Sequence, residues 1–458
     1  MECQENLGIV STVIMVVIMR FAVIGSGISG LASAYLLQNA GEVHLFETAD
    51  RLGGHSNTVD AVFGETAVPV DTGFIVFNPL NYPNLVNLFA ELSVPTIETD
   101  MSFSVSKGGG HMEYEGSVRG LLAQPKNLLR RRYWSMLADI FRFYRHAPDQ
   151  VAAGPNDETL GAFVTRMGYG TAFVDDHLIP MGAAIWSANS ASMMGFPVRS
   201  FMQFMENHKL LNFIDRPQWR TVAGGSREYV KRLAAKLGDA VHLNTDITGL
   251  RREKGGVMLT IKGQGEVWFD KVIMAAHADQ SLALIDDASP VEREILGAFD
   301  FQPNLAILHS DSSLMPRRRG AWAAWNYIEA ASLDISSDSG VSDLCLTYWM
   351  NRLQSIDPAY PLYETLNPVI MPDPALTHVK ISYRHPVFDT KAINAQGRLA
   401  EIQGQSGLFF AGAWTGYGFH EDGLKSAIAI AKTLGVNIPW ISAVKGYEQT
   451  VQQIQDSA

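Results

Sequence analysis

A glycine-rich turn near the start of the chain constrains the fold more than any other feature of the sequence. Residues 21–25 (FAVIG) are an apolar strand, and residues 29–40 have the spacing of a helix. At their junction Gly25, Gly27 and Gly30 form the pattern G-x-G-x-x-G. The first glycine allows a tight turn, the second lets the backbone approach a pyrophosphate, and the third lets the helix pack closely on the strand. Because the free N–H groups of a helix start favour an anion, the turn predicts a dinucleotide site.

An acidic residue ends the next strand. Residues 42–47 (EVHLFE) form that strand, and Glu47 stands seventeen positions after Gly30. A carboxylate at this place can accept hydrogen bonds from the hydroxyls of an adenosine ribose. The segment 47–56 (ETADRLGGHS) then adds an arginine and two glycines that can face phosphate. The sequence therefore predicts a strand–turn–helix–strand unit of the α/β class.

The composition excludes several classes of protein. The 458 residues carry a net charge of −11, which argues against general nucleic-acid binding because that function needs a basic surface. The hydrophobic fraction of 47% and the charged fraction of 18% indicate a globular chain, long enough for two domains. The two cysteines, Cys3 and Cys345, cannot form a disulfide scaffold, and no cluster of histidine and cysteine predicts a metal site. A reducing cytoplasm is the simplest location for such a chain.

Residues 1–20 are expected to be an extension rather than part of the fold. The run 7–19 is mostly apolar, but it is shorter than the roughly 20 residues of a membrane-spanning helix. Glu2 and Glu5 stand where a secretory signal would be basic. The strand before the glycine turn begins cleanly at Met19, so we expect Met19 to be the natural start. A weak membrane anchor is the alternative.

The glycine motif and its continuation resemble those of the flavin-containing amine oxidase superfamily, which includes monoamine oxidases, protoporphyrinogen oxidases and phytoene-type desaturases. In that family the acid is followed by R-x-G-G, as in 47–56, and the next motif is similar to VDTGF at 70–74. Residues 407–431 resemble the family's closing motif, a strand ending in F-A-G, a loop and a helix. Three segments between these motifs also resemble the family: 221–229, 241–247 and 270–276. The nearest match is a bacterial subgroup of predicted FAD-binding oxidoreductases.

The resemblance implies FAD, held without a covalent bond because neither cysteine fits the family's attachment site. It implies an α/β fold of the glutathione-reductase/amine-oxidase type, a Rossmann-like FAD-binding domain with an inserted α+β substrate domain. The helix near Gly423 would point its N-terminus at the flavin and pyrophosphate. The cofactor contacts that the resemblance implies are Gly25, Gly27, Ile28, Ser29, Gly30, Glu47, Arg51, Gly53, Gly54, His55, Ile247, Ala276, Gly412, Glu421, Gly423, Leu424 and Ser426.

The expected domains are interleaved along the chain. The FAD-binding domain is expected to comprise residues 21–80, 221–300 and 400–440, the substrate domain residues 81–220 and 301–399, and the C-terminal tail residues 441–458. Within the substrate part, the pattern predicts helices over 81–92, 126–146, 158–168 and 197–210 and a hairpin over 102–115.

The loop before the last helix departs from the family pattern. Residues 417–422 read YGFHED, and the paired tyrosines of the monoamine oxidase cage are not evident. His420 is the candidate catalytic residue, as a base or as a group that orients the substrate, with packing in a cap turn as the alternative. Glu421 and Asp422 are expected to cap the helix that follows. His55 stands where the family commonly has arginine.

A basic, aromatic-rich segment stands out in this acidic chain. Residues 125–147 combine six Lys and Arg side chains with aromatic and aliphatic ones. Such a helix can lie on an anionic membrane surface, and a core helix with a solvated basic face is the alternative. The expected location is the cytoplasm, with the inner face of the membrane included.

These features leave three functions open. The first is an FAD-dependent oxidoreductase that dehydrogenates or desaturates an apolar substrate, a fatty acyl or isoprenoid chain, by hydride transfer to flavin N5. The second is an FAD-dependent amine oxidase that uses oxygen, and the third is a flavin-binding protein without redox activity. No second G-x-G-x-x-G predicts a nicotinamide domain, so electrons are expected to leave to oxygen, a quinone or a partner protein.

Overall fold

The computed structural model describes residues 18–186, 190–212, 216–329 and 345–441. The N-terminal extension, except for its last residues, and nearly all of the C-terminal tail lie outside these described residues. The first described strand, β1, begins at Met19. Among the helices of these four ranges, none is long and apolar enough to span a membrane.

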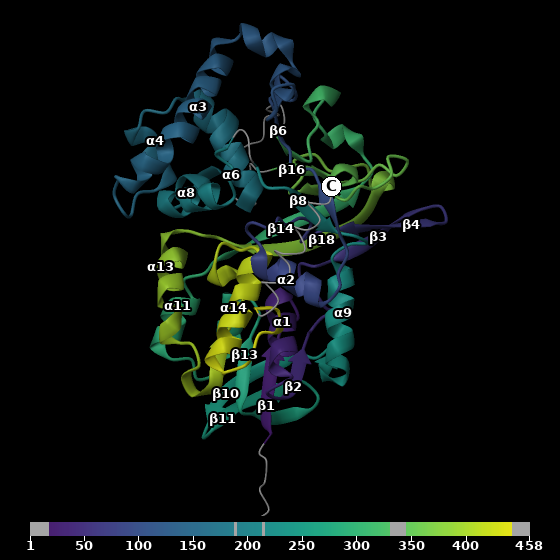
Figure 1. Cartoon of the computed structure of the whole chain (residues 1–458), viewed down its shortest axis with the longest axis vertical. Coiled ribbons are helices and arrows are strands. Elements are labelled where there is room, and N and C mark those ends of the chain that lie inside the picture. The colour runs from purple at the N-terminus through teal and green to yellow at the C-terminus, as the bar shows by residue number, and fades with distance from the viewer. Residues whose placement is uncertain (1–17, 187–189, 213–215, 330–344, 442–458) are drawn as a thin grey trace, which may run out of the picture.

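A five-stranded parallel sheet carries the glycine turn. Its order is β19 (Leu408–Phe410), β13 (Lys271–Met274), β1 (Met19–Ile24), β2 (Gly41–Phe46) and β9 (Val241–His242). One face is covered by α1 (Ile28–Leu37), α14 (His420–Thr433) and α9 (Arg227–Leu237), which lie side by side (Figure 1). The central strands β1 and β13 and the edge strand β19 end in buried apolar runs, as expected of parallel strands buried on both faces. The predicted α/β fold class is confirmed.

The other face of the parallel sheet is covered by strands and helices from the middle of the chain. An antiparallel sheet of β10 (Ile247–Glu253), β11 (Gly256–Ile261) and β12 (Gly265–Phe269) packs there. It is accompanied by α10 (Ala278–Leu284), α11 (Pro290–Leu296) and α13 (Thr390–Arg398). We call the parallel sheet with these two coverings the parallel-sheet half.

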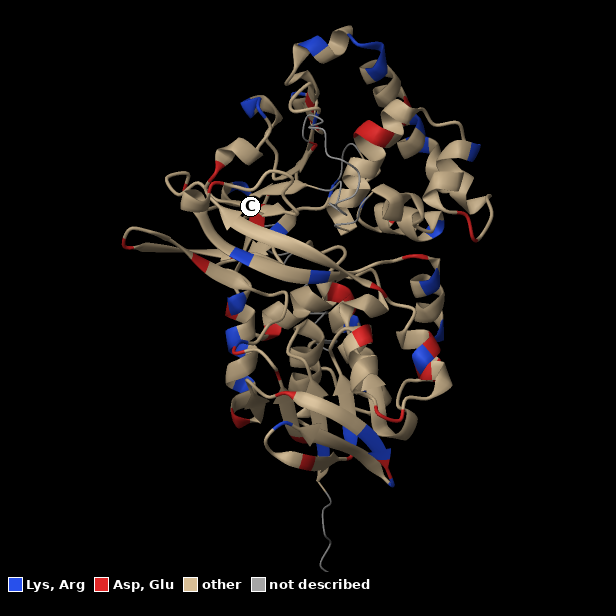
Figure 2. Ribbon diagram, turned by 180° about the vertical axis from the view of Figure 1, so that it is seen from behind, with Lys and Arg blue, Asp and Glu red and all other residues tan. Residues whose placement is uncertain are grey.

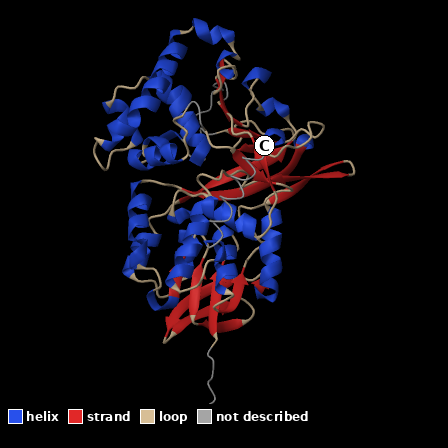
Figure 3. Ribbon diagram, in the orientation of Figure 1, coloured by secondary structure: helices blue, strands red, loops and turns tan. Residues whose placement is uncertain are grey.

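A seven-stranded sheet and a group of helices form the second part of the molecule, which we call the mixed-sheet half. Its strand order is β18 (Thr377–Pro386), β14 (Phe301–His309), β17 (Tyr363–Leu366), β16 (Leu346–Trp349), β15 (Trp325–Ile328), β6 (Phe103–Lys107) and β7 (Met112–Glu115). The helices are α3 (Arg131–Ala152), α4 (Leu160–Arg166), α5 (Thr171–Phe173), α6 (Ile179–Trp186), α7 (Ser190–Met194), α8 (Val198–Asn207) and α12 (Met350–Leu353). Helices α3 to α8 gather at the end of the molecule farthest from the parallel sheet (Figure 3).

Short elements link the two halves. They are the hairpin β3 (Thr58–Phe63) and β4 (Thr66–Asp71), the helix α2 (Pro83–Glu91), and the pair β5 (Thr96–Thr99) and β8 (Trp219–Val222). The predicted hairpin over 102–115 is confirmed, because β6 and β7 pair across Gly108–Gly110.

One predicted helix is divided. The helix expected over 126–146 is a short 3-10 turn (Pro125–Leu129) followed by α3, with Arg130 extended between them. The buried Asn127 fixes this break, because its Nδ2 donates to the carbonyl oxygen of Glu113 at 3.0 Å. That bond holds the turn against β7, and the helix begins only after it.

Candidate functional site

The starts of two helices that are distant in sequence meet in the structure. A Cβ atom added at Gly423 of α14 would lie 2.8 Å from Ile28 Cγ2 and from Ser29 Oγ of α1. Ser426 fixes the approach, since its Oγ accepts from the Gly412 N–H at 3.0 Å. Leu424 is buried in the same helix-covered core. The two N-termini therefore direct their free N–H groups toward one region.

The glycine turn after β1 combines close packing with an opening. A Cβ at Gly30 would lie 1.8 Å from the Gly25 carbonyl oxygen, so only glycine allows this contact between helix and strand. Gly25 has φ +100° and lies against Ala275. At Gly27, by contrast, a Cβ would meet no atom within 4 Å. This is the geometry of a cradle for a phosphate group, since the backbone at Gly27 is reachable and no side chain blocks it.

The loop after β2 packs against this opening. Gly54 has φ +56° and lies next to Gly27. A Cβ atom added at Gly54 would lie 3.2 Å from the Gly27 Cα. Gly53, with φ +109°, donates its N–H to the carbonyl oxygen of Ser26 at 3.0 Å. The exposed Arg51 donates from its guanidinium to the Gly54 carbonyl oxygen at 3.0 Å. Arg51 is therefore held at the rim, where its charge can neutralise a pyrophosphate.

Glu47 is oriented by the backbone at the end of β2. One carboxylate oxygen accepts from Ser26 N at 2.9 Å and from Ser26 Oγ at 2.5 Å, and the other accepts from Ala49 N at 2.9 Å. The Thr245 N–H donates to the Glu47 carbonyl oxygen. The segment after β9 therefore lies at the end of the cofactor site where the adenosine is predicted to bind. Ile247, the last residue of the segment 241–247 and an expected cofactor contact, begins β10 in the antiparallel sheet and is not part of β9.

His420 is held by side chains from three other segments. Its Nε2 lies 2.8 Å from Ser56 Oγ and 3.1 Å from the hydroxyl of Tyr229, and these two hydroxyls also contact each other. Its ring stacks on Phe74 with centroids 3.8 Å apart. Burial lowers the pKa of His420 to about 3, so the imidazole is neutral near pH 7. This environment positions His420 firmly, and its role as a base stays a prediction.

The two acids after His420 act on different helices. Asp422 caps its own helix as predicted, because its carboxylate accepts from Tyr417 N at 3.0 Å and Phe419 N at 3.1 Å. The prediction that Glu421 does the same is wrong. Its carboxylate accepts from the backbone and side chain of Asn84 and from Leu85 N, which lie in the first turn of α2. Only the fold brings the start of α2 to this position, so no local pattern signals it.

Several neighbours of the site carried no distinctive sequence signal. Ser26 and Ser56 are small polar residues inside the glycine motifs, and Tyr229 is one aromatic residue of an ordinary helix. The predicted contact Ala276 follows β13, and its carbonyl oxygen accepts from Trp414 Nε1 at 3.1 Å. Within the described ranges, no group of three or more His, Cys, Asp or Glu side chains could hold a metal ion.

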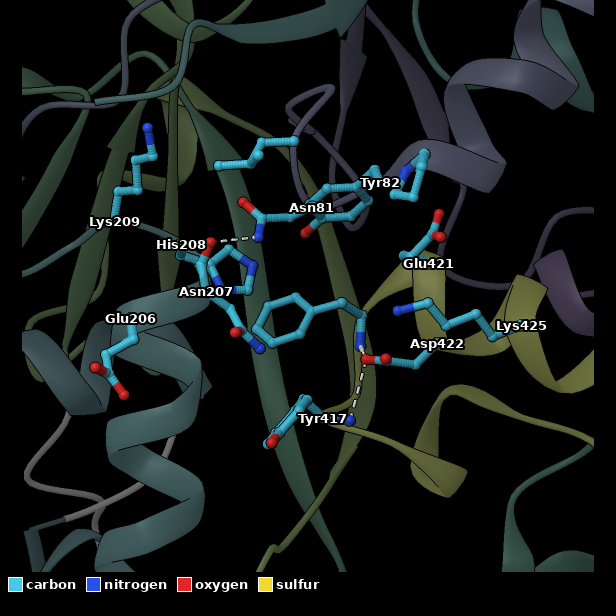
Figure 4. A pocket seen from close by; sticks show the side chains of 13 residues that line it. Asn81, Tyr82, Glu206, Asn207, His208, Lys209, Tyr417, Glu421, Asp422 and Lys425 are labelled. Carbon is cyan, nitrogen blue, oxygen red and sulfur yellow. Dashed lines mark hydrogen bonds between the residues drawn. The ribbon is translucent and has the colours of Figure 1, made fainter. Parts of the chain in front are cut away.

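A cavity of about 420 Å³ opens between the two halves, beside the start of α14 (Figure 4). The start of α2, the end of α8 and the loop before α14 line it. Tyr82, Tyr417 and Phe419 give it aromatic walls, and Lys209 and Lys425 add cationic groups. It provides a solvent-connected space next to the start of α14, and His420, the first residue of that helix, does not itself line it.

A pH measurement checks the burial of His420. Because its pKa in the folded chain is about 3, against an ordinary value of 6.5, the folded state resists a proton that the unfolded chain accepts. Its contribution to stability is complete above about pH 6.5 and is lost as the pH falls toward 3. We expect His420→Gln to reduce the pH slope of the unfolding free energy there by up to about 1.4 kcal/mol per pH unit. Urea titrations of the FAD-free wild type and of FAD-free His420→Gln, repeated between about pH 4 and pH 7, measure how the unfolding free energy changes with pH. Equal changes in the two proteins would contradict the burial of His420.

Known proteins share both the sequence pattern and the fold. The family model for flavin containing amine oxidoreductases matches residues 28–308. AofH of Mycobacterium tuberculosis, a "putative flavin-containing monoamine oxidase", is 28% identical over 292 residues, an alignment that covers 60% of this chain and 60% of AofH.

Two solved structures have the same fold at low identity. A "putative protoporphyrinogen oxidase" from an Exiguobacterium species superposes with a TM-score of 0.64 at 16% identity, over 91% of this chain and 98% of that one. A CLA-producing fatty acid isomerase from P. acnes superposes with a TM-score of 0.60 at 16% identity, over the same 91% and 98%. The resemblance predicted from the glycine and closing motifs is confirmed. Because the family model spans more than half of the sequence, this chain belongs to the flavin containing amine oxidoreductase family, an oxidoreductase family whose cofactor is FAD.

Proposed function

We propose that this protein is an FAD-dependent oxidoreductase that dehydrogenates an apolar substrate, a fatty acyl or isoprenoid chain. The observation that carries the proposal is the opening at Gly27, which lies where the start of α1 meets the start of α14. A single extended cofactor can contact both helix starts there. FAD, when bound, supplies the acceptor for a hydride. The chain holds the cofactor, positions the substrate and excludes water.

The cofactor is proposed to be held by hydrogen bonds and charge alone. Gly27 and Gly54 would receive the pyrophosphate, Glu47 the adenosine ribose, and Arg51 would neutralise phosphate charge. Cys345 is buried next to β16, and burial raises the pKa of its thiol to about 11. A thiol of that pKa is a poor nucleophile near pH 7, which supports non-covalent FAD.

Two features support an apolar substrate. The mixed-sheet half has an extensive core of aliphatic and aromatic side chains that continues to the loop before α14. The fatty acid isomerase with this fold acts on a fatty acid, as its name says. AofH supports the second candidate, an amine oxidase, because it is described as a monoamine oxidase. Electrons are proposed to leave to oxygen, a quinone or a partner protein.

Anaerobic reduction of the bound flavin separates the candidates. The purified protein is scanned for flavin absorbance, its lipids are extracted, and the loaded protein is mixed with fatty acyl chains or with a panel of amines. Bleaching by acyl chains, with co-purified acyl lipid, is the expected result. Bleaching by amines alone, with peroxide formed in air, would replace the proposal with amine oxidation. A fully loaded flavin that no substrate bleaches would favour a non-redox role.

The proposed substrate is reached from an anionic membrane surface. Between Glu115 and Asp139 the chain has no acidic residue but five Lys and Arg, and these lie at the outer end of the mixed-sheet half (Figure 2). Leu129 is 87% exposed and Trp134 is 55% exposed in the same segment. Arg132 is paired with Asp175 and Asp176, and the exposed apolar side chains beside the other cations fit a bilayer of anionic lipid. This surface, residues 117–134, is here called the docking surface.

Vesicle sedimentation tests the docking surface. We expect Leu129→Asp with Trp134→Asp to weaken binding to phosphatidylglycerol vesicles by at least about tenfold, because apolar burial is lost and charge is reversed. Val62→Asp on the β3–β4 hairpin is the control for placing an acid at an exposed apolar position elsewhere, since Val62 is 62% exposed. Membrane docking is refuted if the wild type binds neutral and anionic vesicles equally well, or if the double variant binds anionic vesicles as tightly as the control variant does.

A further inference from the structure

Three histidines from separate segments meet beside the proposed flavin site. His55 follows the Gly53–Gly54 pair, His277 follows β13, and His385 lies in β18 of the mixed-sheet half. The ring of His55 lies 5.4 Å from that of His385 and 6.4 Å from that of His277, between centroids. We call these three residues the histidine wall.

Aromatic rings hold two members of the histidine wall in place. Tyr383 stacks on His55 with centroids 4.9 Å apart, and the Tyr383 hydroxyl is itself fixed by bonds to Asn57 and Thr72. Phe301 stacks on His277 with centroids 4.3 Å apart and planes 7° from parallel. These contacts fix the imidazole planes, so the ring nitrogens have defined directions.

Two nitrogens of the histidine wall have no hydrogen-bond partner within the described part of the chain. They are His55 Nε2 and His277 Nδ1, and both are shielded from solvent. A buried polar atom without a partner costs about 1–3 kcal/mol. Such atoms at a proposed cofactor site indicate that a bound polar molecule completes their bonding.

The imidazoles are uncharged near neutral pH. Burial holds the pKa of His55 well below its usual value, and the repulsion between protonated rings of His55, His385 and His277 lowers it further. Burial also lowers the pKa of His277, and it lowers that of His385 to about 4. Among the described residues, the other charged or titratable groups that face the wall are Tyr383, His420, Arg51, Asp279 and Arg384. Asp279 and Arg384 form an ion pair at 2.7 Å and neutralise each other.

The three histidines lie where the flavin end of a bound dinucleotide is expected. Ligands of parallel α/β sheets bind outside the carboxyl ends of the strands. His277 comes three positions after the end of β13, and Gly54, next to His55, lies against Gly27. The histidine wall is therefore placed beside the opening at Gly27, on the side that the mixed-sheet half covers.

We propose that His55, His277 and His385 form an uncharged hydrogen-bonding wall for FAD, and that one of them takes up a proton when the cofactor is reduced. This inference rests on the proposed function. Oxidation of a CH–CH unit to a double bond releases one hydride and one proton. The hydride goes to the cofactor, which becomes more negative, and the proton goes to the wall, whose new positive charge offsets it. A negative charge that arrives a few ångströms away raises the pKa of a histidine, so the wall needs no fixed cation in the oxidised state.

The midpoint potential of the bound flavin, measured against pH without substrate, tests the wall. Each proton taken up with two electrons contributes about 30 mV per pH unit. We expect two protons in the wild type between about pH 5 and pH 7, one on the cofactor and one on the wall, because the pKa of His385 is about 4 in the oxidised protein and a nearby negative charge raises a pKa by about 1–3 units. The variant with His55→Gln, His277→Gln and His385→Gln is expected to lose one, which halves the slope. His309→Gln is the control, because His309 is also buried with a pKa lowered to about 4, and it lies within the mixed sheet, where its Nε2 is 2.8 Å from Thr365 Oγ1.

The outcomes separate this inference from the proposed function. A one-proton slope in the wild type, or an unchanged slope in the triple variant, overturns the wall. Since no substrate is present, a protein that fails to oxidise acyl chains still gives this readout. If the triple variant binds no FAD, the single variant His385→Gln is measured instead, and a slope equal to that of the control overturns the proposal.

Discussion

Replacement of Gly27 by valine is expected to abolish retention of FAD while the chain still folds. Gly27 has φ −63° and ψ −179°, a backbone conformation that valine adopts readily. A Cβ at this position meets no protein atom within 4 Å, so the side chain would project into the cradle rather than into the core. There it would keep a pyrophosphate from the backbone N–H groups, whose charge-assisted bonds are worth about 1.5–3 kcal/mol each. We expect the affinity for FAD to fall by at least about a hundredfold.

Two other glycines make this prediction specific. Gly397, near the end of α13, is exposed and also has open space at its Cβ, so Gly397→Val should change neither folding nor FAD binding. Gly30→Ala should unfold or destabilise the chain by about 3 kcal/mol, since its Cβ would lie 1.8 Å from the Gly25 carbonyl oxygen. Fluorescence titration of FAD and thermal unfolding measure both effects. If Gly27→Val folds and binds FAD as tightly as the wild type, the pyrophosphate does not bind at Gly27 and the prediction is wrong.

The parts of the site that sequence reasoning predicted are those fixed by local backbone demands. Gly25, Gly53 and Gly54 all have positive φ, which glycine adopts without strain. Glu47 ends a strand at a fixed distance from the turn, so its place follows from the length of the crossover helix. The closing motif was predictable for the same reason, because Gly423 must lie close to α1 for the two helices to meet.

The unpredicted parts depend on packing between distant segments. His385 reaches His55 only because β18 pairs with β14 and crosses back over the parallel-sheet half. The break before α3 depends on the bond from Asn127 to Glu113, a partner in another element. An acid at a helix start predicts a cap of that helix, and nothing in the sequence near Glu421 signals that α2 will lie against it.

Removal of the Glu421 carboxylate is expected to destabilise the junction of α2 and α14 strongly. Glu421 is 3% exposed, and three donors bond to it: Asn84 N at 3.1 Å, Asn84 Nδ2 at 2.7 Å and Leu85 N at 3.0 Å. The two backbone donors belong to the first turn of α2, where no preceding carbonyl can accept from them. The negative carboxylate also lies at the positive end of the α2 dipole. In Glu421→Ala these groups lose their acceptor inside the protein.

The expected loss for Glu421→Ala is about 3 kcal/mol in the free energy of unfolding, since each buried donor left unpaired costs about 1–3 kcal/mol and water can reach only part of the site. Glu421→Gln should lose less, because its amide oxygen still accepts from Asn84 while its NH₂ group cannot accept from Leu85 N. Glu294→Ala is the control: Glu294 is an exposed acid paired with Arg398, and such surface pairs contribute little. Urea denaturation of the FAD-free proteins measures the series. If Glu421→Ala unfolds at the same urea concentration as Glu294→Ala, the carboxylate is not what fastens α2 to α14.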